Sequence, residues 1–171
     1  MSKSYTGIGS RETPPNMLEF MKELGAFLAV KGYTLRSGGA DGADTAFEIG
    51  CDKVNGSKEI YLPWQGFNNN VSQLFQTNPE AIKIAAGIHP SWEACSQEAK
   101  KLHARNIHQV LGAQLATPSN FVIYWAETSR NGEPKGGTRT AVVLAAQRNI
   151  PTYNLKDEIT FHLWKKIVTE S

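Results

Sequence analysis

RSGGADGADT, residues 36–45, is the stretch of this sequence that restricts the fold most. Glycines at positions 38, 39 and 42 allow backbone conformations that are closed to residues with a Cβ atom, and they let main-chain N–H groups approach a ligand closely. Residues 43–51 then show the pattern of a short helix with Ala43 and Phe47 on its packed side. The stretch predicts a glycine-rich turn from a strand into a helix. The alternative is a plain tight turn in which Asp41 or Asp44 serves only as the helix N-cap.

Short apolar segments alternate with helical patterns along the whole chain. Strands are predicted at residues 4–8, 33–36, 58–62, 121–125 and 150–154. Helices are predicted from Pro14 to the stop at Gly32, with Thr13 as N-cap, and at residues 43–51, 91–115, 138–148 and 157–168. Parallel neighbouring strands need crossover connections. The sequence therefore predicts a Rossmann-like α/β fold: a mainly parallel sheet with helices on both faces, in one domain spanning residues 1–171, with a helical insertion around residues 65–118.

Glycine and hydroxyl residues follow three of the predicted strands, and each group precedes a helix. In parallel sheets ligands bind beyond the carboxyl ends of the strands, and helix N-termini favour anions there. No loop has a GxGxxG or GxxxxGK[ST] pattern, so neither a dinucleotide fingerprint nor a P-loop is present. We expect the three loops to hold a phosphate, with these binding residues: Gly7, Gly9, Ser10, Arg11, Ser37, Gly38, Gly39, Ala40, Asp41, Asp44, Gly136, Gly137 and Thr138.

Composition limits the classes of partner. The 18 Lys and Arg residues nearly balance the 16 Asp and Glu residues, so the chain lacks the strongly basic character of a duplex-DNA binder; a nucleic-acid partner is left open and is not favoured. Cys51 and Cys95 are far apart without a CxxC or Cys/His spacing, which predicts packed residues and no metal or other cofactor. Without a signal-peptide pattern or a long apolar run, we expect a cytoplasmic protein with no membrane partner.

Two sets of side chains have two interpretations each. His103, Arg105, Asn106, His108 and Gln109 form a polar cluster in the predicted helix at residues 91–115. A solvated helix face is the favoured interpretation, and the lining of a cleft is the alternative. Trp64, Tyr124 and Trp125 are candidates for stacking on a base, but each is more often a core residue.

Three motifs together resemble the SLOG superfamily, and the DprA/Smf-like group most closely. They are Gly7-Ile-Gly-Ser-Arg11, the segment Ser37-Gly-Gly-Ala-Asp-Gly-Ala-Asp44, and Gly136-Gly137-Thr138, and they span about 130 residues in the same order. The resemblance implies a Rossmann-like sheet that binds a nucleotide or a nucleotide-derived molecule, in a homodimer or higher homo-oligomer. Some domains of this kind act as sensors of such ligands.

The sequence also departs from the superfamily. DprA-like proteins carry additional domains, and none is expected in this chain. LOG phosphoribohydrolases, a second group of the superfamily, have a catalytic glutamate three residues after the GGxGT loop, whereas this sequence has Ala141, or Val143 if the alignment is moved to Thr140. The hydrolase chemistry of that group therefore does not carry over.

Three functions from different classes follow. The favoured one is a binding module that senses or sequesters a nucleotide, such as a cyclic ADP-ribose-like signal. The second is an N-glycosidase acting on nucleoside monophosphates, with Asp41, Asp44, Glu48 and Glu127 as candidate catalytic carboxylates. The third is single-stranded DNA binding in the DprA manner, by convergence of these basic residues: Lys100, Lys101, Arg105, Arg130, Lys135 and Arg139.

Overall fold

Five parallel strands form one sheet in the order β3-β2-β1-β4-β5 in the computed structural model, which describes residues 3–171. The strands are β1 (Lys3–Gly9), β2 (Tyr33–Ser37), β3 (Lys58–Ile60), β4 (Val122–Trp125) and β5 (Thr152–Asn154). Parallel register joins β1 to both β2 and β4, so β1 is the central strand. This is the Rossmann-like α/β fold that the sequence predicts.

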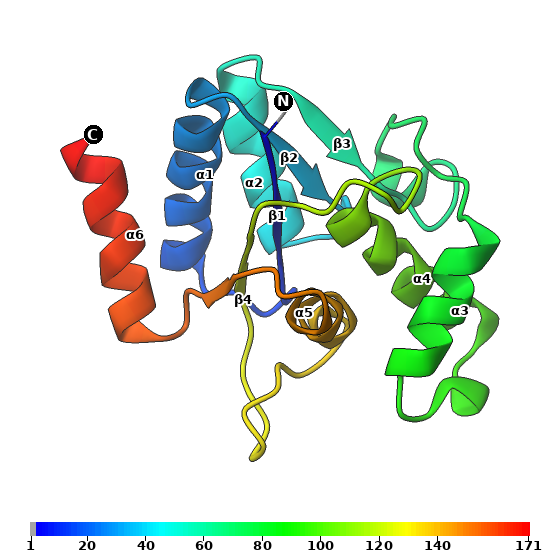
Figure 1. Cartoon of the computed structure of the whole chain (residues 1–171). Coiled ribbons are helices and arrows are strands. Elements are labelled where there is room, and N and C mark those ends of the chain that lie inside the picture. Colours follow the sequence, from blue (N-terminus) through cyan, green and yellow to red (C-terminus); the bar gives the residue numbers. More distant parts are fainter. Residues whose placement is uncertain (1–2) are drawn as a thin grey trace.

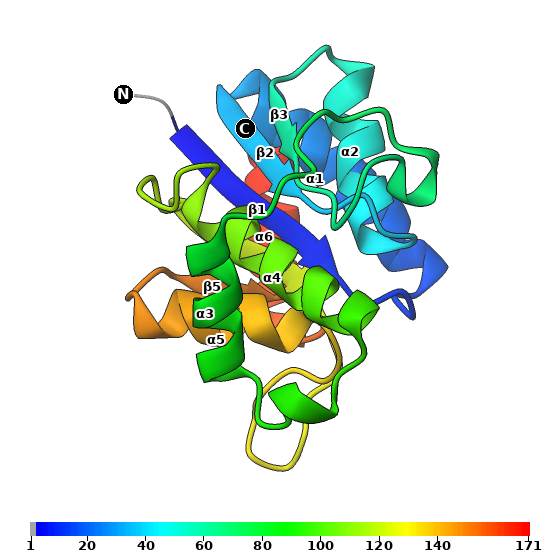
Figure 2. The same cartoon turned by 90° about the vertical axis from the view of Figure 1, so that its right-hand side faces the viewer.

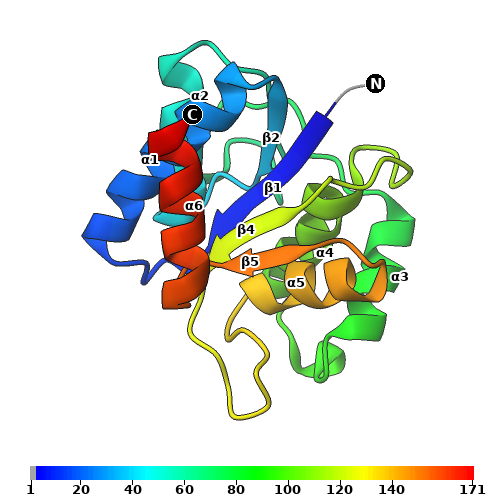
Figure 3. The same ribbon diagram turned by 60° about the vertical axis from the view of Figure 1, so that its left-hand side comes forward.

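In the part of the chain that the structure describes, six α-helices cover the two faces of the sheet. The first face carries α1 (Pro15–Val30), α2 (Ala43–Lys53) and α6 (Glu158–Glu170), and the second carries α3 (Pro79–Ile88), α4 (Gln97–Leu111) and α5 (Thr138–Gln147) (Figures 1 and 2). Each layer has its own apolar core against the sheet. Figure 3 shows the strands side by side with α6 crossing in front of them. Within residues 3–171 no helix has the length and apolar character needed to span a bilayer.

The segment around residues 65–118 is the crossover from β3 at one edge of the sheet to β4 beyond the central strand. It contains two short 3-10 turns, η1 (Phe67–Asn69) and η2 (Trp92–Ala94), besides α3 and α4. The single helix expected over residues 91–115 is shorter, because the chain is extended at Cys95 and the side chain of Ser96 caps α4 at the N–H of Ala99, 3.1 Å away. Helix α3 was not predicted.

The predicted N-cap of α1 and the alternative N-caps considered for α2 are both wrong. Thr13 donates its hydroxyl to the carbonyl of Ser10 at 2.6 Å, and the N-cap position of α1 is Pro14. Gly42 is the N-cap of α2 and offers no side chain, so neither Asp41 nor Asp44 is the cap. The carboxylate of Asp44 instead accepts the N–H of Ala40 at 3.2 Å, outside the helix.

Helices α1 and α2 cross closely because glycine lies on each at the contact. A Cβ atom at Gly25 would lie 2.6 Å from the carbonyl oxygen of Phe47, and one at Gly50 would overlap the carbonyl oxygen of Lys22. Backbone atoms cannot move aside as a flexible side chain can. The close crossing therefore depends on these two glycines.

We predict that Gly50→Ala lowers the free energy of unfolding by about 1–3 kcal/mol, the usual cost of overpacking. Gly87→Ala is the matched control, because Gly87 also lies in a helix and its added Cβ would meet nothing within 4 Å. That variant should be stabilised by about 0.5–1 kcal/mol through helix propensity. Urea denaturation of both variants measures the difference, and equal effects would contradict the close crossing.

Candidate functional site

A crevice lies where β1 and β4 are neighbours. The chain turns from β1 towards β2 on one side and from β4 towards β5 on the other, so the loops after the two strands diverge. The last register pair of the two strands is Gly9 with Trp125. Open α/β sheets bind their ligands at such a point. A cavity of about 650 Å³ opens here.

The three glycine-containing loops converge on this cavity. Nine of the thirteen predicted binding residues line it: Gly9, Ser10, Arg11, Ala40, Asp41, Asp44, Gly136, Gly137 and Thr138. The loops also contact one another, since a Cβ at Gly42 would lie 3.1 Å from the carbonyl oxygen of Ser10. Turns that are far apart in the sequence thus share one end of the sheet.

The other four predicted binding residues do not line the cavity. Gly7 lies under α2, where a Cβ would be 2.8 Å from the ring of Phe47. The hydroxyl of Ser37 donates to the carbonyl of Gly7 at 2.6 Å and is fully buried. Gly39 packs on Leu62, and Gly38 lies against α4. These residues have structural roles.

The N-terminus of α5 supplies unpaired backbone donors to the cavity. Gly136 has a positive φ of 76°, and Gly137 occupies the N-cap position without a side-chain cap bond. Among residues 3–171, no chain acceptor receives the N–H groups of Gly136, Gly137 and Thr138. Free N–H groups and the positive end of a helix dipole together favour an anion.

Helix α4 forms the second wall of the cavity, and its polar cluster is not a solvated face. Arg105, Asn106, His108 and Gln109 are all buried, so the favoured interpretation of the sequence is wrong for these four residues. Arg105, Asn106 and Gln109 line the cavity with His103, as the cleft alternative predicts. His108 lies elsewhere: its ring stacks on Tyr61, and its Nε2 accepts the N–H of Asn78 at 3.1 Å.

Arg105 and Asp44 are buried charges of opposite sign, and both lie next to Gly38. Arg105 donates to the carbonyl oxygens of Gly38 and of Tyr61, the latter at 3.2 Å. Burial raises the pKa of Asp44 to about 6, although the positive charge of Arg105 and the N–H groups of Ala40 and Gly38 act in the opposite direction. Burial lowers the pKa of Arg105 to about 10, so the guanidinium remains charged at neutral pH.

Two further α4 residues lie along this wall of the cavity. Gln109 is 1% exposed, and its Oε1 is buried without a hydrogen-bond partner among the described residues. A buried polar atom without a partner costs about 1–3 kcal/mol. His103 Nδ1 lies 2.9 Å from Thr140 Oγ1 in α5. Burial, with the nearby His89 and Arg105, lowers the pKa of His103 to about 4, so its ring is neutral at pH 7.

Only two of the four candidate catalytic carboxylates, Asp41 and Asp44, reach the cavity. Glu48 forms a 2.8 Å salt bridge with Lys58 and accepts the side-chain N–H of Asn70 at 3.0 Å. Glu127 is exposed in the loop after β4. Asp41 and Asp44 are therefore the carboxylate pair that the cavity offers to a glycosidase mechanism.

Of the aromatic candidates for stacking, Tyr124 and Trp125 are buried in the two cores. Trp64 packs edge-on against Phe67, with 5.4 Å between ring centroids. Phe67 itself lines the cavity and carries Arg105 over its ring at 5.5 Å. No local signal in the sequence identified Phe67, because the loop at residues 64–70 is placed only by its contacts, such as the bond of Asn68 Nδ2 to Asp41 at 2.8 Å.

Fold and cavity together define a Rossmann-like α/β protein with a crevice at the switch of strand order. Its sequence matches no protein-family model and no curated protein. Solved structures do match, among them DNA processing protein A (DprA) from Streptococcus pneumoniae, with a TM-score of 0.56 and 17% identity. The match covers 90% of this chain and 50% of that protein, so the chain spans half the length of this neighbour.

Two further neighbours represent two kinds of protein. The molybdenum cofactor binding protein from Rippkaea orientalis matches with a TM-score of 0.53 and 17% identity, over 99% of this chain and 86% of its own. DprA from Helicobacter pylori, whose single-stranded DNA binding mode has been described, matches with a TM-score of 0.53 and 18% identity, over 90% of this chain and 64% of its own. At these identities the likeness shows the shared fold, which is the DprA-like Rossmann-type fold that the sequence motifs resemble.

Asp44 makes stability depend on pH. Its pKa is raised in the folded protein, so the folded state binds more protons than the unfolded chain between pH 4 and 6, and its contribution to stability is lost as the pH rises through that range. A pKa higher by about 2 corresponds to about 3 kcal/mol. We predict that the unfolding free energy of the wild type falls by up to this amount relative to Asp44→Asn between pH 4 and 7.

Urea denaturation at several pH values measures this difference. Asp157→Asn is the control. The hydrogen bonds of Thr160 lower the pKa of Asp157, so the contribution of Asp157 to stability is lost as the pH falls, which is the opposite of Asp44. If the unfolding free energies of the wild type and Asp44→Asn change with pH in the same way, the carboxylate of Asp44 is not buried as described.

Proposed function

We propose that this protein binds a nucleotide or a nucleotide-derived small molecule in the cavity, with a phosphate at the N-terminus of α5. The observation that carries the proposal is the set of three consecutive free N–H groups at Gly136, Gly137 and Thr138. They begin a helix of 10 residues and line a cavity whose volume lies in the range of small-molecule sites.

The charges around the cavity support an anionic ligand. Arg11, Lys135, Arg139 and Arg105 line it, against Asp41 and Asp44. Arg139 is paired with Glu133 at 2.9 Å, whereas Arg11 and Lys135 form no salt bridge within residues 3–171. Arg11 is the cation best suited to grip a phosphate in bidentate fashion, because it extends from a loop that faces the α5 N-terminus across the same cavity.

The opposite wall suits the rest of such a ligand. Phe67 offers an aromatic surface for a base. The neighbours of this fold include proteins that carry a small cofactor, which is consistent with a binding module. In this proposal the protein senses or sequesters its ligand, and cyclic ADP-ribose-like nucleotides are members of the class to be tested, as is the molybdenum cofactor.

The two alternative functions have less support. A glycosidase would have to use Asp41 and Asp44, because Glu48 is paired with Lys58 and Glu127 is exposed outside the cavity. The carboxylate of Asp44 is already engaged by the N–H of Ala40 and the charge of Arg105. Single-stranded DNA binding has the DprA neighbours in its favour. However, Lys100, Lys101 and Arg130 do not line the cavity with Lys135 and Arg139. We also expect the protein to form a homodimer or a higher homo-oligomer, as its resemblance to the SLOG superfamily implies.

We predict that Arg11→Ala weakens phosphorylated-ligand binding by about 1.5–3 kcal/mol, or roughly 10–150-fold, because a charge-assisted hydrogen bond is lost. Calorimetry with AMP, ADP, ADP-ribose and cyclic dinucleotides measures the effect. The control is Arg148→Ala, which removes the same charge at the far end of α5 and should leave affinity unchanged.

The proposal would be contradicted if the protein bound none of these compounds, or if Arg11→Ala and Arg148→Ala lost the same amount of affinity. Affinity for an oligothymidylate that falls steeply with salt, without nucleotide binding, would favour the DNA-binding alternative. Release of a free base from a nucleoside monophosphate, lost in Asp41→Asn, would favour the glycosidase.

A further inference from the structure

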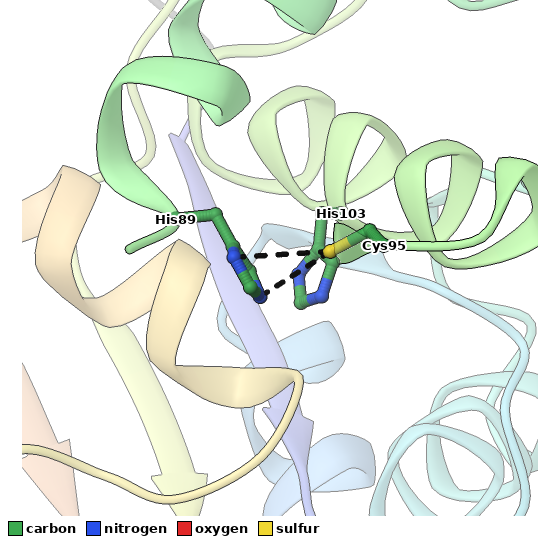
Figure 4. Close-up of side chains that lie close together, drawn as sticks. All are labelled: His89, Cys95 and His103. Atoms are coloured by element: carbon green, nitrogen blue, oxygen red, sulfur yellow. Dashed lines mark hydrogen bonds between the residues drawn. The ribbon is translucent and has the colours of Figure 1, made fainter. Parts of the chain in front are cut away.

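Two histidines and a cysteine converge at the side of the cavity where α3 and α4 meet. His89 follows the last turn of α3, Cys95 lies between η2 and α4, and His103 lies in α4. Figure 4 shows the three side chains pointing towards one another. One ligand-type atom of each residue lies within 4.8 Å of those of the other two. The spacing of the three residues matches no metal-binding motif, which is why the sequence predicts no metal site.

The distances are close to those of a tetrahedral metal site. Cys95 Sγ lies 3.7 Å from Nε2 and 3.8 Å from Nδ1 of His89, and the rings of His89 and His103 have centroids 4.5 Å apart. With Zn–S of about 2.3 Å and Zn–N of about 2.0–2.1 Å, tetrahedral geometry places sulfur and nitrogen ligands roughly 3.6 Å apart. Small side-chain rotations would therefore bring all three donors around one ion.

We propose that His89, Cys95 and His103 bind one tetrahedral dication of the zinc class, with its fourth coordination position open to the cavity. The donor set of a thiolate and two imidazoles suits a borderline-soft ion and not Mg²⁺ or Ca²⁺, which prefer oxygen. Zinc sites with three protein ligands keep the fourth position for water or a ligand atom. His89 and His103 both line the cavity, so that position faces it. The site requires no nucleotide and goes beyond the proposed function.

The surroundings of the two imidazoles fit this role with one rearrangement. When His103 carries its proton on Nδ1, it donates to Thr140 Oγ1 at 2.9 Å and leaves the Nε2 lone pair for the metal. Such a partner for the second ring nitrogen is the usual outer-shell arrangement of a metal-bound histidine. His89 Nδ1 accepts the exposed N–H of Ser91 at 3.0 Å. Metal binding would replace this bond, and the N–H of Ser91 can then bond to water.

A blue-copper type of site does not fit the neighbourhood. That site adds a weak axial methionine to two histidines and a cysteine. Among the described residues, the methionines are Met17 and Met21, and both lie in α1 on the other face of the sheet. A closed structural site is also disfavoured, since the described residues supply only three donors to the cluster.

Titration of the reduced, metal-free protein with Co²⁺, followed by competition with Zn²⁺, tests the proposal. We expect one equivalent of Co²⁺ to bind with the intense visible bands of tetrahedral cobalt and a near-ultraviolet thiolate charge-transfer band, both of which Zn²⁺ removes. Cys95→Ser should abolish the charge-transfer band, and His103→Gln should abolish the tetrahedral spectrum. Thr140→Val should weaken Zn²⁺ binding by about 10–100-fold, the usual effect of losing an outer-shell partner.

Matched controls use the same residue types away from the cluster. Cys51→Ser changes the other cysteine, which lies on the buried side of α2, and His162→Gln changes an exposed histidine of α6. Both should retain the wild-type cobalt spectrum, and circular dichroism verifies that every variant is folded. Three results would each overturn the proposal: no bound metal in the wild type, a spectrum of octahedral cobalt without the thiolate band, or an unchanged spectrum in folded Cys95→Ser.

Discussion

The buried guanidinium of Arg105 is the contact on which the geometry of the cavity depends. It joins α4 to the ends of β2 and β3 through the carbonyls of Gly38 and Tyr61, and its Nε donates to Asn106 Oδ1 at 3.0 Å. Asn106 continues the connection to α5, because its Nδ2 donates to the carbonyl of Gly137 at 2.9 Å. One chain of hydrogen bonds thus links three loops across the carboxyl end of the sheet. Loss of Arg105 would leave buried carbonyls without donors, at about 1–3 kcal/mol each.

Glycine at position 38 is explained by packing inside the protein and not by contact with a ligand. A Cβ there would overlap the side-chain amide of Gln109 and would lie 2.6 Å from Arg105 and 2.8 Å from Asp44. The carboxylate of Asp44 balances the charge of Arg105 and also holds the N–H of Ala40. The glycine-rich loop after β2 is therefore fixed mainly by the protein itself. The loop before α5 differs, because the N–H groups of Gly136, Gly137 and Thr138 have no acceptor among the described residues.

The fold could be predicted from the sequence because apolar strands, helical periodicity and turn glycines are local signals. The convergence of Ser10, Asp41 and Thr138 followed from the general geometry of parallel sheets. The burial of α4 could not be predicted in this way, because Arg105, Asn106 and Gln109 are polar and their burial depends on distant partners such as Gly38 and Gly137. The His89–Cys95–His103 cluster also needs tertiary structure, since the η2 turn and the break before α4 bring its members together.

The first turn of α5 connects the two parts of the cavity. Thr138 offers a free N–H to the proposed phosphate, while Thr140, two residues later, contacts His103 of the histidine–cysteine cluster. A helix turn moves as a rigid unit, so a shift that improves the phosphate contacts also moves the partner of His103. Asn106, one turn along α4 from His103, is bonded to Gly137 and limits such a shift. The two proposals therefore share one structural element: the phosphate would use the N–H of Thr138, and the metal ligand His103 would depend on its contact with Thr140.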